Sequence, residues 1–284
     1  MSARLSPERR MTGPLAALLP LAPVLSLAPV LSLALVLSLG VAGCASDRPP
    51  APPPPSPAPT PQGLDAARDE LAALAAAAQD RHLTARYTLR SPGLPDRVVV
   101  VTSADDGTWR VDVAGGALGG TVDVSLTATT DGLYQCVLPS AGRAAGCVRL
   151  GDRNGTVPYR LDPRVQHPFT DWLAVLTDRR APLAVSPARP PDGAAGTSGA
   201  CFSVESTTAA LSPPLDVGIY CYDRDGTLTA VRTATGTLTL AGPPGPAPAT
   251  VQLAGPVTDG EPLAVAGPEA GSTVTPVLGG TGTS

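Results

Sequence analysis

Hydrophobic and polar positions alternate with two different periods along the chain. Between Leu64 and Asp80, apolar residues recur every three or four positions with charged residues between them, which predicts an amphipathic, alanine-rich helix. Further along, the period falls to two, and short alternating segments separated by Asp-Gly and Gly-rich turns predict half-buried antiparallel strands. The predicted strands cover residues 86–90, 109–113, 122–127, 201–204, 217–223, 227–233 and 237–240.

A second helix is indicated near Pro168. Phe169, Trp172, Leu173 and Leu176 fall on one face of such a helix, and Pro182 is expected to end it. The segment 186–198 is rich in proline and glycine and is expected to be a loop. Together the elements predict an α+β fold, in which a curved antiparallel β-sheet carries two helices on one face.

The N-terminal region has the features of an export signal. Arg4, Arg9 and Arg10 precede a long apolar stretch over residues 15–41. The sequence Val-Ala-Gly-Cys that follows, ending at Cys44, resembles the lipobox of bacterial lipoproteins. We therefore expect cleavage before Cys44 and lipidation of its sulfur. An uncut membrane-spanning anchor and soluble secretion are the alternatives.

Four regions follow from these signals. Residues 1–43 are expected to be a lipoprotein signal peptide, with either Met1 or Met11 as the start. Residues 44–62 hold the lipidated cysteine and a Pro-rich tether, which is extended and semi-rigid because proline fixes φ. Residues 63–265 form the folded domain. Residues 266–284 are small and polar and are expected to be a disordered tail.

Apart from Cys44, the chain has an even set of cysteines: Cys136, Cys147, Cys201 and Cys221. In an oxidising compartment such a set indicates disulfides, and four cysteines allow three connectivities. Proximity in the sequence favours Cys136 with Cys147 and Cys201 with Cys221. Free buried thiols are the alternative. No metal site is expected, because the spacings are not C-x-x-C pairs and neither histidine has a second one near it.

Charge and motif content argue against several function classes. The basic residues number 20, all of them arginine, against 24 acidic residues, so nucleic acid is not an expected partner. Residues 196–200 read Gly-Thr-Ser-Gly-Ala, which does not complete a nucleophile elbow, and residues 223–226 fit a tight turn better than a calcium loop. His82 and His167 are expected to have capping or surface roles. We therefore expect a non-enzyme that needs no cofactor.

Three segments carry a resemblance to a known family. They are Ser-Pro-Gly-Leu-Pro at 91–95, Trp-Arg-Val-Asp-Val at 109–113 before Gly115-Gly116, and Gly-Ile-Tyr-Cys-Tyr-Asp-Arg-Asp-Gly at 218–226. Together with the order of lipobox, tether, helix and two strand meanders, they make residues 63–265 similar to the LolA-like lipoproteins of the LppX/LprG type. The resemblance implies a half-barrel whose helices pack on the concave face over an apolar cavity, and it implies transport of acylated lipids.

Two functions remain open on this basis. The first is a lipoprotein at the outer face of the cell membrane, anchored by acyl chains, that binds or carries a lipid or glycolipid. The second is a non-enzymatic envelope scaffold with a fully packed core; an exported hydrolase lacks the residues for a site. The oligomeric state is open. The candidate ligand-binding residues, which occupy the inward stripes of the predicted elements, are Leu71, Leu74, Trp109, Val111, Val122, Val124, Phe169, Trp172 and Leu176.

Overall fold

The computed structural model describes residues 61–267 except 193, 195–197 and 209–212. The predicted signal peptide, Cys44 and most of the predicted tether lie outside these residues, as does the predicted tail from residue 268. No helix in the described part of the chain is both long enough and apolar enough to cross a membrane.

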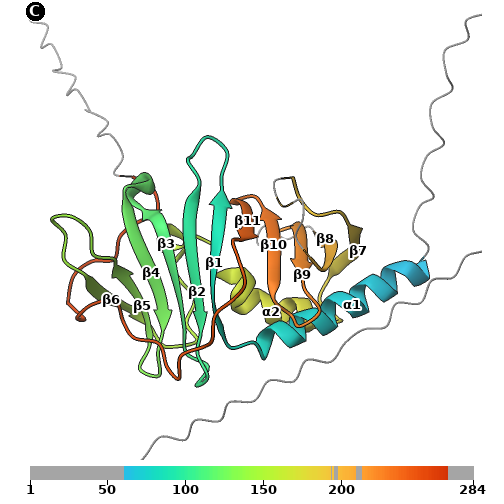
Figure 1. Cartoon of the computed structure of the whole chain (residues 1–284), viewed down its shortest axis with the longest axis horizontal. Helices are drawn as coiled ribbons and strands as arrows, with labels where there is room; N and C mark the ends of the chain where they lie inside the picture. Colours follow the sequence, from blue (N-terminus) through green and yellow to red (C-terminus); the bar gives the residue numbers. More distant parts are fainter. Residues whose placement is uncertain (1–60, 193, 195–197, 209–212, 268–284) are drawn as a thin grey trace, which may run out of the picture. The chain divides into compact units, whose positions relative to one another are not determined.

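Eleven strands form one open antiparallel sheet (Figure 1), which confirms the α+β class. Their order is β6-β5-β4-β3-β2-β1-β11-β10-β9-β8-β7, so two meanders meet where β1 pairs with β11. Apart from β6 and β7, which lie at opposite ends of the sheet, strands that follow each other in the sequence pair as antiparallel neighbours, as expected of two meanders. The strands are β1 Leu83–Arg90, β2 Arg97–Ser103, β3 Trp109–Ala117, β4 Val122–Ala128, β5 Leu133–Val137, β6 Gly146–Gly151, β7 Leu183–Ala188, β8 Ala200–Ser206, β9 Gly218–Tyr222, β10 Leu228–Thr233 and β11 Gly236–Leu240.

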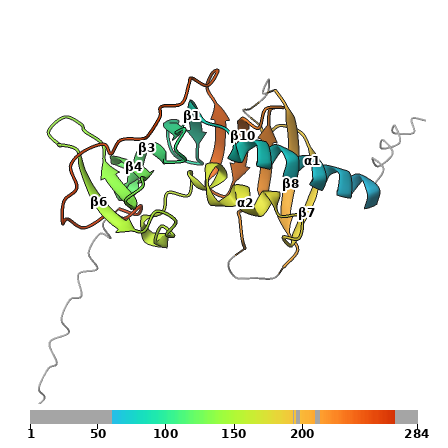
Figure 2. The ribbon, with the colours of Figure 1, turned by 90° about the horizontal axis from the view of Figure 1, so that it is seen from below.

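Two α-helices, α1 Pro61–Gln79 and α2 Asp171–Thr177, lie against each other on the same side of the sheet (Figures 1 and 2). The apolar stripe of α1 is made of short side chains, with Ala67, Leu71 and Ala75 buried. The predicted first helix is therefore confirmed. Three short 3-10 helices complete the set: η1 Leu118–Gly120, η2 Tyr159–Leu161 and η3 His167–Phe169.

Strand register decides which side chains face the helices. Tyr87 of β1 lies opposite Val99 of β2, which lies opposite Val113 of β3, and all three are buried in the main core with α1 and α2. We call this side of the sheet the helix face and the other side the far face. Because side chains alternate along a strand, Arg86 and Thr88 are on the far face.

The second helix differs from the prediction. Phe169 belongs to η3, and α2 begins only at Asp171 because the backbone at Thr170 is not helical, with φ −129° and ψ −110°. The helix also ends at Thr177, well before Pro182, since Asp178 is already extended. The four apolar residues of the predicted stripe therefore come from two short helical segments joined by a bend.

The predicted loop at 186–198 is wrong at its start, because β7 continues to Ala188. Pro187 lies inside β7 and opposite Phe202 of β8. Proline is tolerated there because β7 is the last strand of the sheet, where one side of the backbone needs no partner strand. Helix α1 packs against β7.

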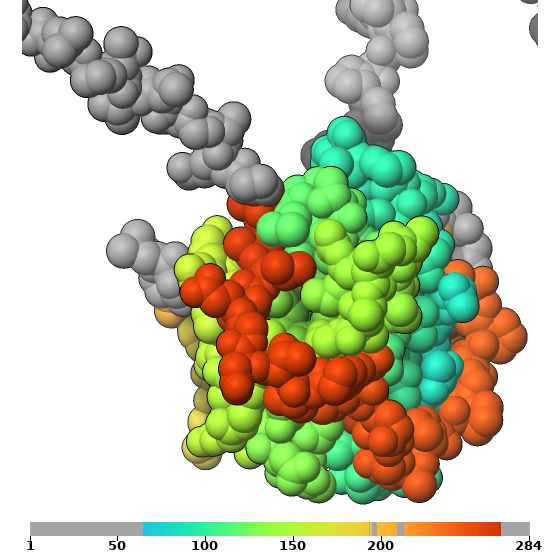
Figure 3. All heavy atoms as spheres, turned by 90° about the vertical axis from the view of Figure 1, so that its left-hand side faces the viewer, coloured from blue at the N-terminus to red at the C-terminus, as the bar shows by residue number. Residues whose placement is uncertain are grey.

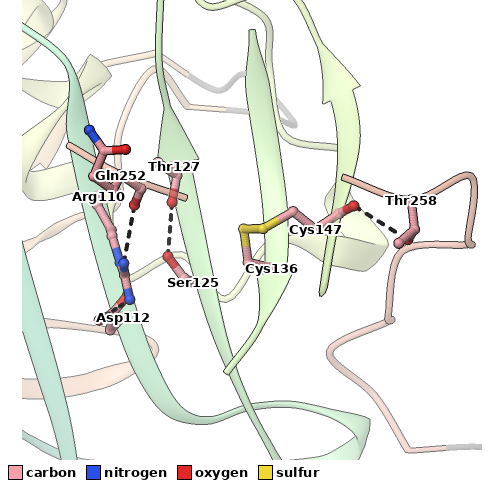
Figure 4. The surroundings of a disulfide bond; sticks show 8 residues. All are labelled: Arg110, Asp112, Ser125, Thr127, Cys136, Cys147, Gln252 and Thr258. Atoms are coloured by element: carbon pink, nitrogen blue, oxygen red, sulfur yellow. Dashed lines mark hydrogen bonds and ion pairs between the residues drawn. A yellow bond between two sulfur atoms is a disulfide. The ribbon is translucent and has the colours of Figure 1, made fainter. Parts of the chain in front are cut away.

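Both predicted disulfides are present. Cys136 and Cys147 are directly opposed on β5 and β6, with their Cα atoms 3.9 Å apart (Figure 4). Cys201 and Cys221 are directly opposed on β8 and β9, with Cα atoms 4.0 Å apart. Each disulfide joins neighbouring strands on the far face, so neither links a helix to the sheet.

After β11 the chain returns along the sheet as an extended segment, residues 245–265, which we call the C-terminal strap (red in Figure 3). It pairs with the outer edge of β6: the amide of Cys147 donates to the carbonyl oxygen of Pro256 at 2.8 Å, and the amide of Thr258 donates to the carbonyl oxygen of Cys147 at 2.8 Å. The strap thus occupies the outward-facing backbone amide and carbonyl of Cys147, which an edge strand would otherwise leave free.

Candidate ligand cavity between the helices and the sheet

A small cavity lies between the helices and the helix face of the sheet. Its volume is about 60 Å³. Strands β1, β2, β9 and β10 form the floor, while α1, η3 and α2 form the roof. The walls are mainly apolar and aromatic, and include Leu83, Tyr87, Val101, Phe169, Leu173 and Tyr222.

Two tyrosines in the cavity wall differ in their hydrogen bonding. Tyr87 packs against Phe169, with ring centroids 5.0 Å apart, and its hydroxyl donates to the carbonyl oxygen of Leu228 at 2.9 Å. The hydroxyl of Tyr222 is buried and has no hydrogen-bond partner among the described residues. Burial raises the pKa of both phenols above the usual value, so both stay neutral. A buried hydroxyl without a partner destabilises a protein by about 1–3 kcal/mol.

The β9–β10 turn closes one end of the cavity. Gly226 in this turn has φ +84°, and a Cβ there would lie 2.4 Å from the backbone nitrogen of Ala78 at the end of α1. Only glycine lets the turn approach the helix this closely. Beside it, Arg81 forms an ion pair with Asp225 at 3.0 Å, with both side chains partly exposed to solvent. The cavity therefore has an apolar interior and a charged rim.

Seven of the nine predicted ligand-binding residues lie in the main core between the helices and the sheet. Of these, only Phe169 lines the cavity. Leu71, Val111 and Leu176 have no exposed surface and pack against other core residues. The other three in the main core are Leu74, Trp109 and Trp172.

The remaining two, Val122 and Val124, lie on the helix face but not beneath the helices. They form a separate cluster with Ala117, and Leu263 of the C-terminal strap packs on it. The amide of Gln135 holds the strap there, donating to the carbonyl oxygen of Leu263 and accepting from its backbone nitrogen. The prediction that Val122 and Val124 share one cavity with the helix residues is wrong, because the C-terminal strap covers this part of the sheet.

Sequence reasoning missed the tyrosines of the cavity wall, although the sequence contains a signal for Tyr222. Cys221 must face its disulfide partner on the far face, so Tyr220 and Tyr222 must face the helices. The contact of Tyr87 with Phe169 joins β1 to η3 and depends on how the helices are placed. Strand alternation alone gives no information on that placement.

The fold and the cavity define an α+β protein with an open eleven-stranded antiparallel sheet, two disulfides that each join neighbouring strands, and a small apolar cavity under its helices. Comparison with protein-family models found no match, and comparison with curated proteins found no match either.

Proposed function

We propose that this chain is a cell-envelope lipoprotein, held at the outer face of the cell membrane by acyl chains on Cys44, that binds a hydrophobic ligand between its helices and its sheet. In this proposal the sheet acts as a half-barrel with the helices on its concave face. The observation that carries the proposal is the unpartnered hydroxyl of Tyr222 in an apolar cavity. A lipid-like molecule with one polar group would supply the missing hydrogen bond.

Unpartnered polar atoms at the interface between the helices support the proposal that the helices can move away from the sheet. Arg68 of α1 is buried, and its Nη2 donates to the carbonyl oxygen of Asp178, but its Nε and Nη1 have no partner among the described residues. Burial lowers the pKa of this guanidinium. Arg68, between the two helical segments, and Tyr222, on the sheet beneath them, each leave a buried polar atom without a partner, which makes the packed state of the helix layer less stable.

The cavity must enlarge for this function. Pockets for small ligands are commonly roughly 300–1,000 Å³, whereas this one is about 60 Å³. Entry of an acyl chain would require α1 or η3 to move away from the sheet. Because α1 presents mainly alanines to the sheet, its displacement exposes less apolar area than that of a leucine-rich helix.

The second candidate function is a non-enzymatic envelope scaffold with a packed core. It is favoured by the small cavity volume and by the complete burial of Leu71, Val111 and Leu176. The two functions differ in one measurable way. Only a lipid-binding protein should co-purify with a bound lipid, whereas a scaffold with a packed core should not.

Native mass spectrometry of the full chain, purified from its own host, tests the proposal. We expect a bound non-covalent lipid in the wild type. Val101→Leu adds a methylene at the cavity wall and should be tolerated by the fold while reducing the bound lipid. Val111→Leu, on the same face of the next strand but away from the cavity, is the matched control and should cost about 1–3 kcal/mol by overpacking. A wild type without lipid, and equal loss of stability in both variants, would establish the scaffold instead.

A further inference from the structure

A second and larger hollow lies on the other side of η3 from the apolar cavity. Its volume is about 320 Å³, and it is bordered by the β3–β5 part of the sheet, the segment 153–157 and the start of α2. We call it the polar pocket. Its walls include Trp109, Leu133, Asn154, Gln166, His167 and Asp171.

His167 fixes one wall of the polar pocket. Its Nδ1 lies 2.7 Å from Oδ1 of Asp171 and its Nε2 lies 2.8 Å from Oδ2 of Asp162, and its ring stacks on Trp172 with centroids 5.1 Å apart. Burial alone would lower the pKa of His167, but the hydrogen bonds and charges of the two carboxylates outweigh it and raise this pKa to about 9. With both N–H groups donated, His167 serves as a structural cation, and its predicted capping or surface role is wrong.

Gln166 supplies an unused acceptor. The residue is 2% exposed, and its Nε2 donates to Oδ1 of Asp162 at 2.7 Å. A carboxylate can only accept here, so Asp162 fixes the orientation of the amide. The amide oxygen Oε1 is then left buried without a partner among the described residues, on a residue that lines the polar pocket. A ligand that donates a hydrogen bond would satisfy it.

The charges around the polar pocket balance. Arg153, protonated His167 and Asp171 line the pocket, and Asp162 lies behind His167 and pairs with it. Two positive and two negative groups therefore surround the pocket, which favours neither an anion nor a cation. Arg153 is also engaged with the carbonyl oxygen of Gly107 at 2.6 Å. What remains available is a mixture of hydrogen-bonding groups and the aromatic surface of Trp109.

These features match an uncharged ring with several hydroxyl groups. Such a ring has an apolar C–H face that packs on an aromatic side chain, and hydroxyls that both donate and accept. Exposed Asn154 and Thr156 at the rim can bind further hydroxyls. The volume lies at the lower end of the roughly 300–1,000 Å³ of small-molecule pockets, which suits one or two sugar units.

We propose that the polar pocket binds an uncharged sugar ring, which donates a hydroxyl to Oε1 of Gln166 and packs one face on Trp109. The site uses different residues from the apolar cavity and does not depend on a lipid ligand. A negative result for sugar binding would therefore leave the proposed lipid-binding function untouched, and the reverse also holds.

Saturation-transfer difference NMR tests this inference on the full chain in a zwitterionic detergent that contains no sugar. The probes are D-glucose, D-galactose, D-mannose and N-acetyl-D-glucosamine, with tetramethylammonium and inorganic phosphate as charged controls. At least one neutral sugar should receive saturation while both charged probes receive none. Absence of saturation in every sugar, or preferential saturation of a charged probe, would overturn the inference.

Variants then locate the binding. Trp109→Leu and Gln166→Met should each weaken sugar binding about tenfold or more. The rim variant Asn154→Ala/Thr156→Val changes only exposed residues, so it tests the site even if a wall variant fails to fold. Thr88→Val, on the far face of β1, is the matched control and should bind like the wild type. If the rim variant and Trp109→Leu both bind sugar as tightly as the wild type, the site lies elsewhere.

Discussion

At the scale of single residues, the side chains with the most unusual environments lie around η3. His167 bridges two carboxylates on one side of this segment, while Phe169 packs on Tyr87 on the other side. Asp162 and Asp171 have lowered pKa values: burial alone would raise them, but hydrogen bonds and charge from His167 outweigh it. These groups make the stability of the domain depend on pH.

We expect the free energy of unfolding to fall as pH rises from about 6.5 to 9.5. The pKa of His167 is about 9 in the folded protein against an ordinary value of 6.5. Its contribution is therefore complete below the unfolded value and is lost as pH rises through the folded one, by on the order of 3 kcal/mol. Urea unfolding at several pH values measures this. His167→Gln should flatten the profile in that range, and an unchanged slope in the variant would contradict the assignment.

Acid should also destabilise the domain, for the opposite reason. The folded pKa values of Asp162 and Asp171 lie below the ordinary 3.8, so their contribution is present above that value and is lost as pH falls through the folded pKa values. The same urea series, extended to low pH, should therefore show a second decline. Asp162→Asn should reduce it, whereas Asp65→Asn on exposed α1 should leave it unchanged.

Tyr222 and Tyr87 offer a matched pair of substitutions. Tyr222→Phe removes a hydroxyl that has no partner, so it should leave the ligand-free domain as stable as before or stabilise it by about 1 kcal/mol. Tyr87→Phe removes a hydroxyl that donates to Leu228 and should destabilise the domain by about 1–2 kcal/mol. Urea unfolding of protein freed of lipid compares them. Equal destabilisation by the two substitutions would show that Tyr222 has a partner.

At the scale of elements, the sequence predicts those in which apolar and polar residues recur with a regular period. The helix at α1 and the strands β1, β3 and β4 follow from their periodicity, as do the disulfides from the short spacing of their cysteines. β5 is different, because its sequence Leu-Tyr-Gln-Cys-Val shows no alternation of apolar and polar residues, and four of its five residues are buried. The reason is that the C-terminal strap covers part of its far face, with Leu253 and Ala254 packed on Tyr134 and Cys136.

Other elements lack a local signal for physical reasons as well. β7 contains Pro187, which argues against a strand unless the strand is known to be at an edge. The polar pocket depends on His167 and Asp162 being brought together by η3 and the segment before it. That segment has no regular period, so the burial of His167 and Gln166 could not be read from the sequence.

Removal of the C-terminal strap should expose the β6 edge. A chain ending at residue 244 loses the backbone hydrogen bonds to Cys147 and the cover over Val122 and Val124. Unpaired edges promote strand pairing between molecules, so we expect a lower melting temperature and self-association. Sedimentation velocity and thermal unfolding measure both effects. A chain ending at residue 267 keeps the strap and should sediment and melt like the full chain. Equal behaviour of the two truncations would show that the strap does not protect the edge.

At the scale of the whole molecule, the proposed acylation of Cys44 would decide where the domain works. If Cys44 is acylated, as proposed, Cys44→Ala should shift the protein from the membrane fraction to the unprocessed precursor or the medium. Cell fractionation with intact-mass analysis of the product measures this. Cys44→Ser tests the need for sulfur, since it preserves size but cannot form the thioether. A wild-type protein whose mature N-terminus carries no lipid would refute the anchor.

The two disulfides have a mechanical consequence. Each joins two neighbouring strands on the far face, so no disulfide ties α1 to the sheet in the described part of the chain. If the protein is anchored ahead of residue 61, tension between membrane and domain acts first on α1. In the described part of the chain this helix is joined to β1 through residues 80–82 and is otherwise held to the sheet by non-covalent contacts. The β5–β6 and β8–β9 pairs are crosslinked by disulfides and resist separation under such tension, whereas α1 can detach from the sheet. A stretched tether would then open the space between helix and sheet, and slack would let it close.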